Sequence, residues 1–304
     1  MLAAVLGPEG GLGLSEMDKP VPGPGEALIR VRACGVCSSD MGVYRTGLNE
    51  EVVLGHEVVG TVESLGEGAS GPLVGTRVTG AIMRGYAEYT LARAEHLIPI
   101  PDALSDPEAI VEPLSCMLSG IRRAGCAGAE RAVIVGAGFM GLALIALTKA
   151  AGVGRVEVCD VSPEALARAR DFGADAVHLP DDPPPTCAFV FETAGSQGAL
   201  TWCGELAARL GTLTIVGYHP CKREIDMGVW AGKALTVINA FEYDRGVQLE
   251  NMRYALELAE RGALPLKRLF THSFPLHQVD RAFQTHLNRP EGFIKGYIRM
   301  DGAQ

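Results

Sequence analysis

Hydrophobic and polar residues alternate over short distances in the first third of the chain. Up to about Pro101, runs of β-forming residues are separated by turn signals such as PVPGPGE and GEGASGP. The runs are LAAVL, EALIRVRACG, EVVGTVESLG, TRVTGA and YAEYTLAR. Short strands joined by tight turns are typical of a compact, barrel-like β domain.

The pattern changes from about Glu112 to Phe241, where strands and helices alternate. A strand before Gly136 and a helix to about Ala151 are followed by the strand RVEVCD and the helix SPEALARARDFG, with Ser162 as its N-cap. CAFVFETAG, TLTIVGY and KALTVINAF are predicted as further strands, and GALTWCGELAARLG as a further helix. This alternation predicts an α/β fold with a parallel, doubly wound sheet.

After Phe241 the alternation stops. LENMRYALELAERG has the pattern of an amphipathic helix, and the chain continues with THSFPLHQVDRAFQTHLN and a last strand, GFIKGYIRM. We therefore expect residues 242–304 to pack on residues 1–112 as one domain, with residues 113–241 as the second.

Gly136, Gly138 and Gly141 form a G-x-G-x-x-G motif between the first strand and helix of the second domain. In such a turn the first glycine allows the tight bend, the second lets the backbone approach a pyrophosphate, and the third allows helix-on-strand packing. Phe139 and Met140 open the predicted helix, where N–H groups and the helix dipole favour an anion. The motif predicts a dinucleotide site.

Asp160 ends the second strand, 19 residues after Gly141. A carboxylate at that place accepts hydrogen bonds from the ribose diol of an adenosine. Asp160 would repel a 2′-phosphate, and no arginine follows it directly. The sequence therefore favours NAD over NADP.

Composition narrows the function classes. The 304 residues carry 27 Lys and Arg against 36 Asp and Glu, a net charge of −9 without a basic cluster, so nucleic acid is not an expected partner. The start, MLAAVLGPEGG, lacks the basic region of a secretion signal. The uncharged stretch over residues 132–148 is short and interrupted by glycines, so we expect no membrane span and a cytoplasmic protein.

Two short groups of residues, CSSD and GHE, carry candidate metal ligands. Cys37 and His56 supply a thiolate and an imidazole, and a catalytic zinc site uses three protein ligands with one open position. The third ligand is either Glu57 or Glu112, and spacing does not decide between them. Each residue also has a structural interpretation: Cys37 as a buried core cysteine, His56 as part of a structural His–Glu pair, and Glu112 as a helix-start carboxylate. Among the eight cysteines only Cys34 and Cys37 form a C-x-x-C pair, so a four-cysteine structural zinc site is not expected.

With these residues in view, the chain resembles the zinc-dependent medium-chain dehydrogenases, the alcohol and polyol dehydrogenase family, over nearly its whole length. The matching segments are PGPGEALIRVRACGVCSSD, LGHEVVGTVESLGEG, RGYAEYTLAR, VGAGFMG with the later Asp160, and GFIKGYIRM. The resemblance implies a GroES-like β-barrel catalytic domain, built from both chain ends, and a central Rossmann domain. It is strongest to the sorbitol and threonine dehydrogenase type.

The resemblance also implies roles for single residues. Cys37 and His56 match zinc ligands, and Glu112 matches a third ligand or its carboxylate substitute. Glu57 matches a carboxylate that binds the metal in sorbitol-dehydrogenase-like members. Ser39 matches the hydroxyl that takes the substrate proton and Asp40 a residue that orients the histidine, while Thr193 and Lys295 match positions near the cofactor ribose and diphosphate.

The implied reaction is hydride transfer between NAD and a secondary alcohol, such as a polyol, cyclitol or amino alcohol, or its ketone, with one Zn²⁺ per chain. The alternatives are a lyase or epimerase with transient oxidation, a zinc-free reductase, and a non-catalytic NAD-binding protein. KALTVINAF is a candidate sheet edge that pairs with a second copy, so we expect a homodimer or homotetramer.

Two departures from the family pattern change what is expected. TRVTGAIMRGYAEY contains no cysteine where most zinc alcohol dehydrogenases carry a structural-zinc lobe, so we expect a single zinc and a more open rim. Gly42 stands where many members have a relay histidine, so the proton leaves by another route, such as water. Tyr44, Arg84 and Tyr218 are candidates for the substrate pocket or for packing.

Overall fold

The computed structural model describes residues 1–48 and 50–300 and divides into two compact units. The barrel unit consists of Met1–Pro113, Arg245–Gly262 and Leu266–Gln304, and the sheet unit of Leu114–Asp244 and Ala263–Pro265. The sequence pattern predicted changes after residues 112 and 241, whereas the units change after Pro113 and Asp244. Helix α2 (Glu112–Ala124) contains the first of these junctions.

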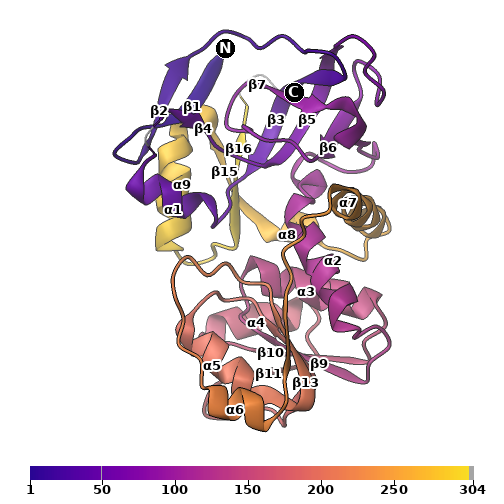
Figure 1. The fold of residues 1–304 in the computed structure, drawn as a ribbon, viewed down its shortest axis with the longest axis vertical. Coiled ribbons are helices and arrows are strands. Elements are labelled where there is room, and N and C mark those ends of the chain that lie inside the picture. The colour runs from indigo at the N-terminus through magenta and orange to yellow at the C-terminus, as the bar shows by residue number, and fades with distance from the viewer. Residues whose placement is uncertain (49, 301–304) are drawn as a thin grey trace. The chain divides into compact units, whose positions relative to one another are not determined.

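The barrel unit contains, among the described residues, a seven-stranded and a three-stranded sheet (Figure 1). The larger sheet has the order β15-β16-β3-β5-β6-β8, with β7 also paired to β3. Its strands are β3 (Glu26–Gly35), β5 (Glu57–Leu65), β6 (Arg77–Gly80), β7 (Tyr89–Arg93), β8 (Leu97–Pro99), β15 (Phe270–Pro275) and β16 (Lys295–Arg299). The smaller sheet has the order β2 (Leu12–Glu16), β1 (Leu2–Leu6) and β4 (Val52–Val53). The predicted β domain is confirmed.

Both ends of the chain build this unit. Strand β16 pairs antiparallel with β3, so that Tyr297 lies opposite Gly35 and Arg299 opposite Ala33. In Figure 1 the yellow strands β15 and β16 accordingly lie with the indigo and purple strands of the first hundred residues. The last strand therefore fixes the end of β3, the segment that leads to Cys37.

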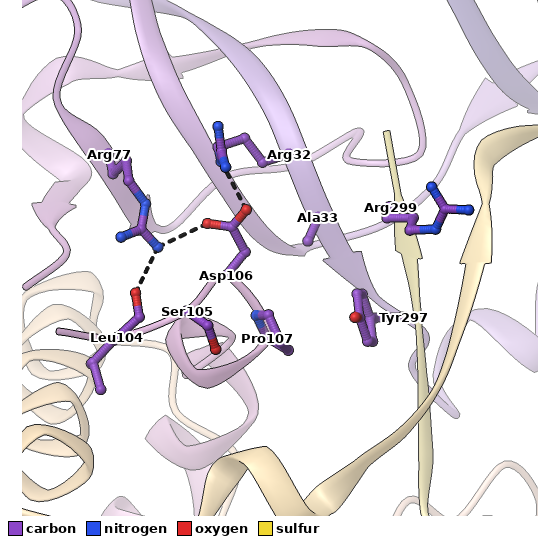
Figure 2. Close-up of a pocket in the computed structure, with 9 residues that line it drawn as sticks. All are labelled: Arg32, Ala33, Arg77, Leu104, Ser105, Asp106, Pro107, Tyr297 and Arg299. Carbon is purple, nitrogen blue, oxygen red and sulfur yellow. Dashed lines mark hydrogen bonds and ion pairs between the residues drawn. The ribbon is translucent and has the colours of Figure 1, made fainter. Parts of the chain in front are cut away.

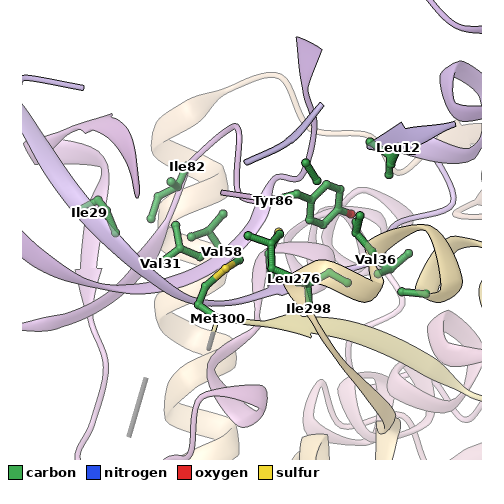
Figure 3. Close-up of a cluster of buried hydrophobic side chains, with 14 of the residues drawn as sticks. Leu12, Ile29, Val31, Val36, Val58, Ile82, Tyr86, Leu276, Ile298 and Met300 are labelled. Atoms are coloured by element: carbon green, nitrogen blue, oxygen red, sulfur yellow. The ribbon is translucent and has the colours of Figure 1, made fainter. Parts of the chain in front are cut away.

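A hydrophobic cluster fills the barrel unit (Figure 3). Ile29, Val31 and Ile298 are almost completely buried, and Tyr86 and Phe283 meet edge to face with ring centroids 5.5 Å apart. Burying one side chain of this size contributes about 1.5–3 kcal/mol. The cluster holds strands from both chain ends against helix α9 (Val279–Asn288), and α1 (Asp40–Thr46) covers it next to α9.

The remaining helical segments of the barrel unit are short except for α7. They are η1 (Ala94–His96), η2 (Pro107–Ala109), α7 (Arg245–Glu260), α8 (Leu266–Leu269) and η3 (Leu276–Gln278). No helix in the described part of the chain is both long and apolar enough to span a bilayer.

The sheet unit is a six-stranded parallel sheet with the order β11-β10-β9-β12-β13-β14, which confirms the doubly wound fold. The strands are β9 (Arg131–Val135), β10 (Arg155–Cys159), β11 (Ala176–His178), β12 (Cys187–Glu192), β13 (Ala207–Ile215) and β14 (Thr236–Asn239). The helices are α3 (Phe139–Ala150), α4 (Pro163–Asp171), α5 (Gln197–Leu206) and α6 (Met227–Gly232). The chain reverses its direction of progress across the sheet between β9 and β12, where such folds bind ligands.

One predicted helix is wrong in its last five residues, AARLG. GALTWCGELAARLG was expected to be helical throughout, but α5 ends at Leu206 and Ala207 begins β13. Ala207 pairs with Cys187 of β12, and Leu210 has a positive φ of 60°, so tertiary pairing overrides the helix propensity of AARLG. The predicted N-cap Ser162 is confirmed, because its side chain accepts a hydrogen bond from Ala165 N.

Candidate active site

Three potential metal ligands meet in the barrel unit. The ligand atoms of Cys37, His56 and Glu57 all lie within 4.8 Å of one another. Strand pairing explains this, because β3 ends at Gly35, opposite Glu57, the first residue of β5. A side chain at Gly35 would collide with the Glu57 carboxylate, so the glycine leaves the room that the carboxylate occupies.

Glu57 is the buried member of the cluster. Its side chain is 0% exposed, and its Oε1 accepts a hydrogen bond of 2.8 Å from Lys295 Nζ. Within the described residues, Oε2 has no hydrogen-bond partner. Leaving a buried carboxylate oxygen without a partner is costly, and a bound cation would satisfy it. This oxygen therefore fits a metal site.

Lys295 lies beside Glu57 in this cluster. It is 5% exposed and also donates to the Val36 carbonyl at 3.1 Å. Burial lowers the pKa of Lys295, but the neighbouring charges, with Glu57 first, raise it above its ordinary value overall. The lysine expected near the cofactor diphosphate thus stays protonated and holds one oxygen of Glu57.

His56 lies in an anionic environment. Its Nδ1 is 3.6 Å from Asp40 Oδ1, which leaves Nε2 as the ring nitrogen for a metal. Burial lowers the pKa of His56, but the hydrogen bond and charge of Cys37, with the charges of Glu112 and Asp40, raise it to about 10. The surroundings of this ring favour positive charge, which is the condition that a divalent cation needs.

Asp40 is held in place by a hydrogen bond from a buried tyrosine. Tyr86 is fully buried, and its hydroxyl donates to Asp40 Oδ2 at 2.8 Å and lies 3.0 Å from the Gly35 carbonyl. Burial is the main cause that raises the pKa of Asp40, while His56 and the Tyr86 hydrogen bond lower it. Tyr86 was visible in the sequence only as part of RGYAEY, with no sign of this contact.

Glu112 stands outside the group of three. It begins α2, and burial raises its pKa to about 7, against the opposing effect of the His56 charge. Its charge acts on His56, but its oxygens are not among the atoms that meet within 4.8 Å. The geometry therefore favours Glu57 over Glu112 as the third ligand.

Two serines follow Cys37. Ser39 Oγ donates to Cys37 Sγ at 3.2 Å, so the hydroxyl expected to take the substrate proton lies beside a candidate ligand. Ser38 Oγ and His286 Nε2 are 2.9 Å apart. Burial lowers the pKa of His286 to about 3, so its ring is neutral. His286 lies on α9, far from Ser38 along the chain, and no sequence motif singled it out.

None of the three pocket candidates is a member of this cluster, and Tyr218 belongs to the sheet unit. Tyr44 is buried, donates to Asp280 Oδ1 at 2.6 Å and packs on Phe283, so its role is packing. Arg84 is exposed with a φ of 59°, and Tyr218 is half-exposed in the sheet unit.

The glycine turn in the sheet unit has room for a ligand. Gly136 has a φ of 109°, which favours glycine, and a side chain on Gly141 would collide with the Gly136 carbonyl. A Cβ on Gly138 would meet none of the described atoms within 4 Å. Gly138 is also the N-cap of α3 and provides no side-chain cap. The open space beside this helix start is compatible with the predicted diphosphate.

Asp160 and Thr193 lie on either side of this turn. Asp160, just after β10, accepts hydrogen bonds from Ala137 N at 2.7 Å and Ser162 N at 2.8 Å. Thr193 Oγ1 lies 3.0 Å from the Val135 carbonyl and 2.9 Å from that of Gly136, and it donates toward both. Both residues thus contact the turn from the ends of β10 and β12, the two strands that flank β9.

A buried carboxylate that the sequence did not single out shapes the loop after Thr193. Glu192 is completely buried, and its Oε1 accepts from the backbone N–H groups of Ala194 and Gly195. Its Oε2 is 2.9 Å from His219 Nε2. The FETAG segment therefore has its backbone fixed from inside the sheet unit.

The cluster of Cys37, His56 and Glu57 in the barrel unit and the glycine turn in the sheet unit are the features of a metal-dependent dehydrogenase that uses a dinucleotide cofactor. The comparisons with known proteins agree. A model of the alcohol dehydrogenase GroES-like domain matches residues 23–102. The chain is 27% identical to chicken (Gallus gallus) sorbitol dehydrogenase, over 99% of this chain and 96% of the relative.

Solved structures share the fold. Galactitol-1-phosphate dehydrogenase from Escherichia coli superposes with a TM-score of 0.86 at 21% identity, covering 98% of this chain and 100% of that one. An alcohol dehydrogenase from Escherichia coli CFT073, solved with NADH, has a TM-score of 0.87 at 21% identity, covering 98% and 99%. The domain match, the full-length similarity to the sorbitol dehydrogenase relative and the shared fold together support the zinc-dependent medium-chain dehydrogenase family for this chain.

Proposed function

We propose that this protein is an NAD-dependent zinc dehydrogenase that interconverts a secondary alcohol of polyol, cyclitol or amino-alcohol type and its ketone. The observation that carries the proposal is the cluster of Cys37, His56 and Glu57, in which no described residue forms a hydrogen bond with the buried Oε2 of Glu57. The sorbitol dehydrogenase relative supports a polar substrate, and galactitol-1-phosphate is the substrate named for a neighbour that shares the fold.

Cys37, His56 and Glu57 would hold one Zn²⁺ per chain, since zinc accepts sulfur, nitrogen and oxygen ligands and a catalytic site keeps one position open. When bound, the ion supplies Lewis acidity that lowers the pKa of a coordinated hydroxyl. Glu112, with its raised pKa of about 7, is the nearby carboxylate that could replace Glu57.

The neighbouring side chains then have separate tasks. Ser39 takes the proton of the substrate hydroxyl, since its own hydroxyl lies 3.2 Å from Cys37 Sγ. Asp40, held by Tyr86, orients the His56 ring, and Lys295 fixes one oxygen of Glu57. We assign Lys295 to Glu57 rather than to the cofactor. Because Gly42 replaces the relay histidine, water receives the proton from Ser39.

NAD is the cofactor in this proposal. The turn of Gly136, Gly138 and Gly141 leads into α3, where the backbone of Phe139 and Met140 faces the diphosphate. The carboxylate of Asp160 accepts from the adenosine ribose and disfavours a 2′-phosphate. Thr193 places its loop at the nicotinamide-side ribose.

The oligomeric state is a further part of this proposal. Strand β14 is a sheet edge whose residues are mostly exposed, which favours pairing with a second copy into a homodimer or homotetramer. The mass of the purified protein in solution distinguishes a monomer, a dimer and a tetramer.

We also propose that the protein acts in the cytoplasm on a small-molecule substrate, and export of the tagged chain would contradict this.

A panel of polyols, cyclitols, amino alcohols and simple secondary alcohols tests the activity. We expect NADH formation at 340 nm with at least one polar alcohol, and zinc near one ion per chain in the same sample. Cofactor binding without turnover on the whole panel would support a non-catalytic NAD-binding protein instead. Product formation without net NADH would indicate a lyase or epimerase.

A further inference from the structure

A cavity in the barrel unit has three arginines in its lining. Its volume is about 480 Å³, within the range of small-molecule pockets. Three of its lining residues are Arg32, Arg77 and Arg299, and the only acidic one is Asp106. Figure 2 shows Asp106 between the guanidinium groups of Arg32 and Arg77. Tyr297 lies to the right of Asp106 in this view, beyond Pro107. The chain carries a net charge of −9, so this concentration of positive charge stands out from the average surface.

The arginines are held in place by the barrel. Arg32 and Arg299 come from the paired strands β3 and β16, where Met300 N donates to the Arg32 carbonyl at 3.0 Å, and Arg77 begins β6. Their backbones therefore belong to one sheet. A charged site on strands rather than loops is largely preformed, so little entropy is lost when a ligand binds.

Asp106 orients two guanidinium groups but accepts a hydrogen bond from only one nitrogen of each. Its Oδ2 accepts from Arg32 Nε at 2.8 Å, and its Oδ1 from an Arg77 terminal nitrogen at 2.8 Å, with all three side chains about a fifth to a quarter exposed. No described residue accepts from the two terminal nitrogens of Arg32. Arg77 Nε is buried and has no partner among the described residues.

We propose that this cavity binds a small organic dianion that carries phosphate or carboxylate oxygens. Guanidinium groups match the geometry of both oxyanions, and the terminal nitrogens of Arg32 are the donors still available. Pro107, Leu104 and the Tyr297 ring supply an apolar wall, and the volume exceeds that of a bare phosphate, so the ligand has an organic part. The lining of the cavity includes none of the three residues of the metal cluster.

Calorimetric titration of the purified protein tests this, with glycerol 2-phosphate and malonate as the two probes and potassium chloride at matched ionic strength as the blank. We expect one site per chain with a Kd below about 1 mM for at least one probe. Tighter binding of one probe identifies the oxyanion as phosphate or carboxylate. No heat above the chloride blank with either probe overturns the proposal.

Arg32→Gln should weaken binding about tenfold or more, since hydrogen bonds to charged groups are lost. The matched control is Arg30→Gln, because Arg30 precedes Arg32 by two residues on β3, does not line the cavity and has only a loose, exposed ion pair with Glu63. Equal weakening in both variants would show non-specific charge attraction and overturn the site. If Arg32→Gln does not fold, Arg32→Lys, which keeps the charge and loses the fork, should also weaken binding. Neither titration requires zinc, NAD or turnover. The binding result therefore stands even if the proposed function is wrong.

Discussion

Replacement of Cys37 by alanine should yield a folded protein with less than about a tenth of a zinc ion per chain and turnover reduced about a thousandfold or more. The thiolate is one of three ligand atoms that meet within 4.8 Å, and its loss leaves an imidazole and a carboxylate. Two ligands of that kind hold zinc far more weakly than three. Metal analysis and an NAD reduction assay on the same sample measure both effects.

The matched control is Cys34→Ala, the other cysteine of the C-x-x-C pair. Cys34 is completely buried in the hydrophobic cluster of the barrel unit and is not part of the metal group. Burial raises the pKa of its thiol well above the ordinary value, so it remains a neutral core side chain. This variant should keep its zinc and most of its turnover. Full activity in Cys37→Ala, or equal loss of zinc in both variants, would contradict the assignment.

Replacement of Asp160 by alanine should raise the KM for NAD about tenfold to a hundredfold, with a much smaller change in kcat. The variant loses the charged acceptor for the ribose diol and the hydrogen bond to Ala137 N in the glycine turn. It also loses the repulsion of a 2′-phosphate, so kcat/KM for NADP should rise relative to that for NAD. Initial rates with the two cofactors measure both changes.

Asp175→Ala separates this effect from the general loss of a carboxylate. Asp175 accepts from Val156 N at 2.7 Å and from Lys149 Nζ at 3.1 Å in the same unit, but it lies outside the glycine turn. This variant should keep its KM for NAD. An unchanged KM for NAD in Asp160→Ala would show that the cofactor does not use this carboxylate.

Local patterns were sufficient for most of the fold. Alternating β-formers between turn signals predicted the strands around EALIRVRACG and EVVGTVESLG, and the glycine turn predicted the start of α3. Both signals depend on residues that are neighbours in the chain. The error at AARLG has the opposite origin, because only the pairing of Ala207 with Cys187 makes that segment a strand.

The contacts around the candidate metal site could not be predicted in the same way. Lys295 and Glu57 are 238 positions apart, and their ion pair depends on β16 joining β3. Tyr86 reaches Asp40 across 46 positions for the same kind of reason. The choice between Glu57 and Glu112 also needed the pairing of Gly35 with Glu57, which spacing does not contain.

X-ray absorption at the zinc K-edge of the purified protein tests the central claim most directly. We predict one sulfur at about 2.3 Å and nitrogen and oxygen neighbours at about 2.0–2.2 Å, and the same shell in the zinc-retaining Cys34→Ala variant. A zinc shell without sulfur, a shell of several sulfurs, or a protein that takes up no zinc would contradict it.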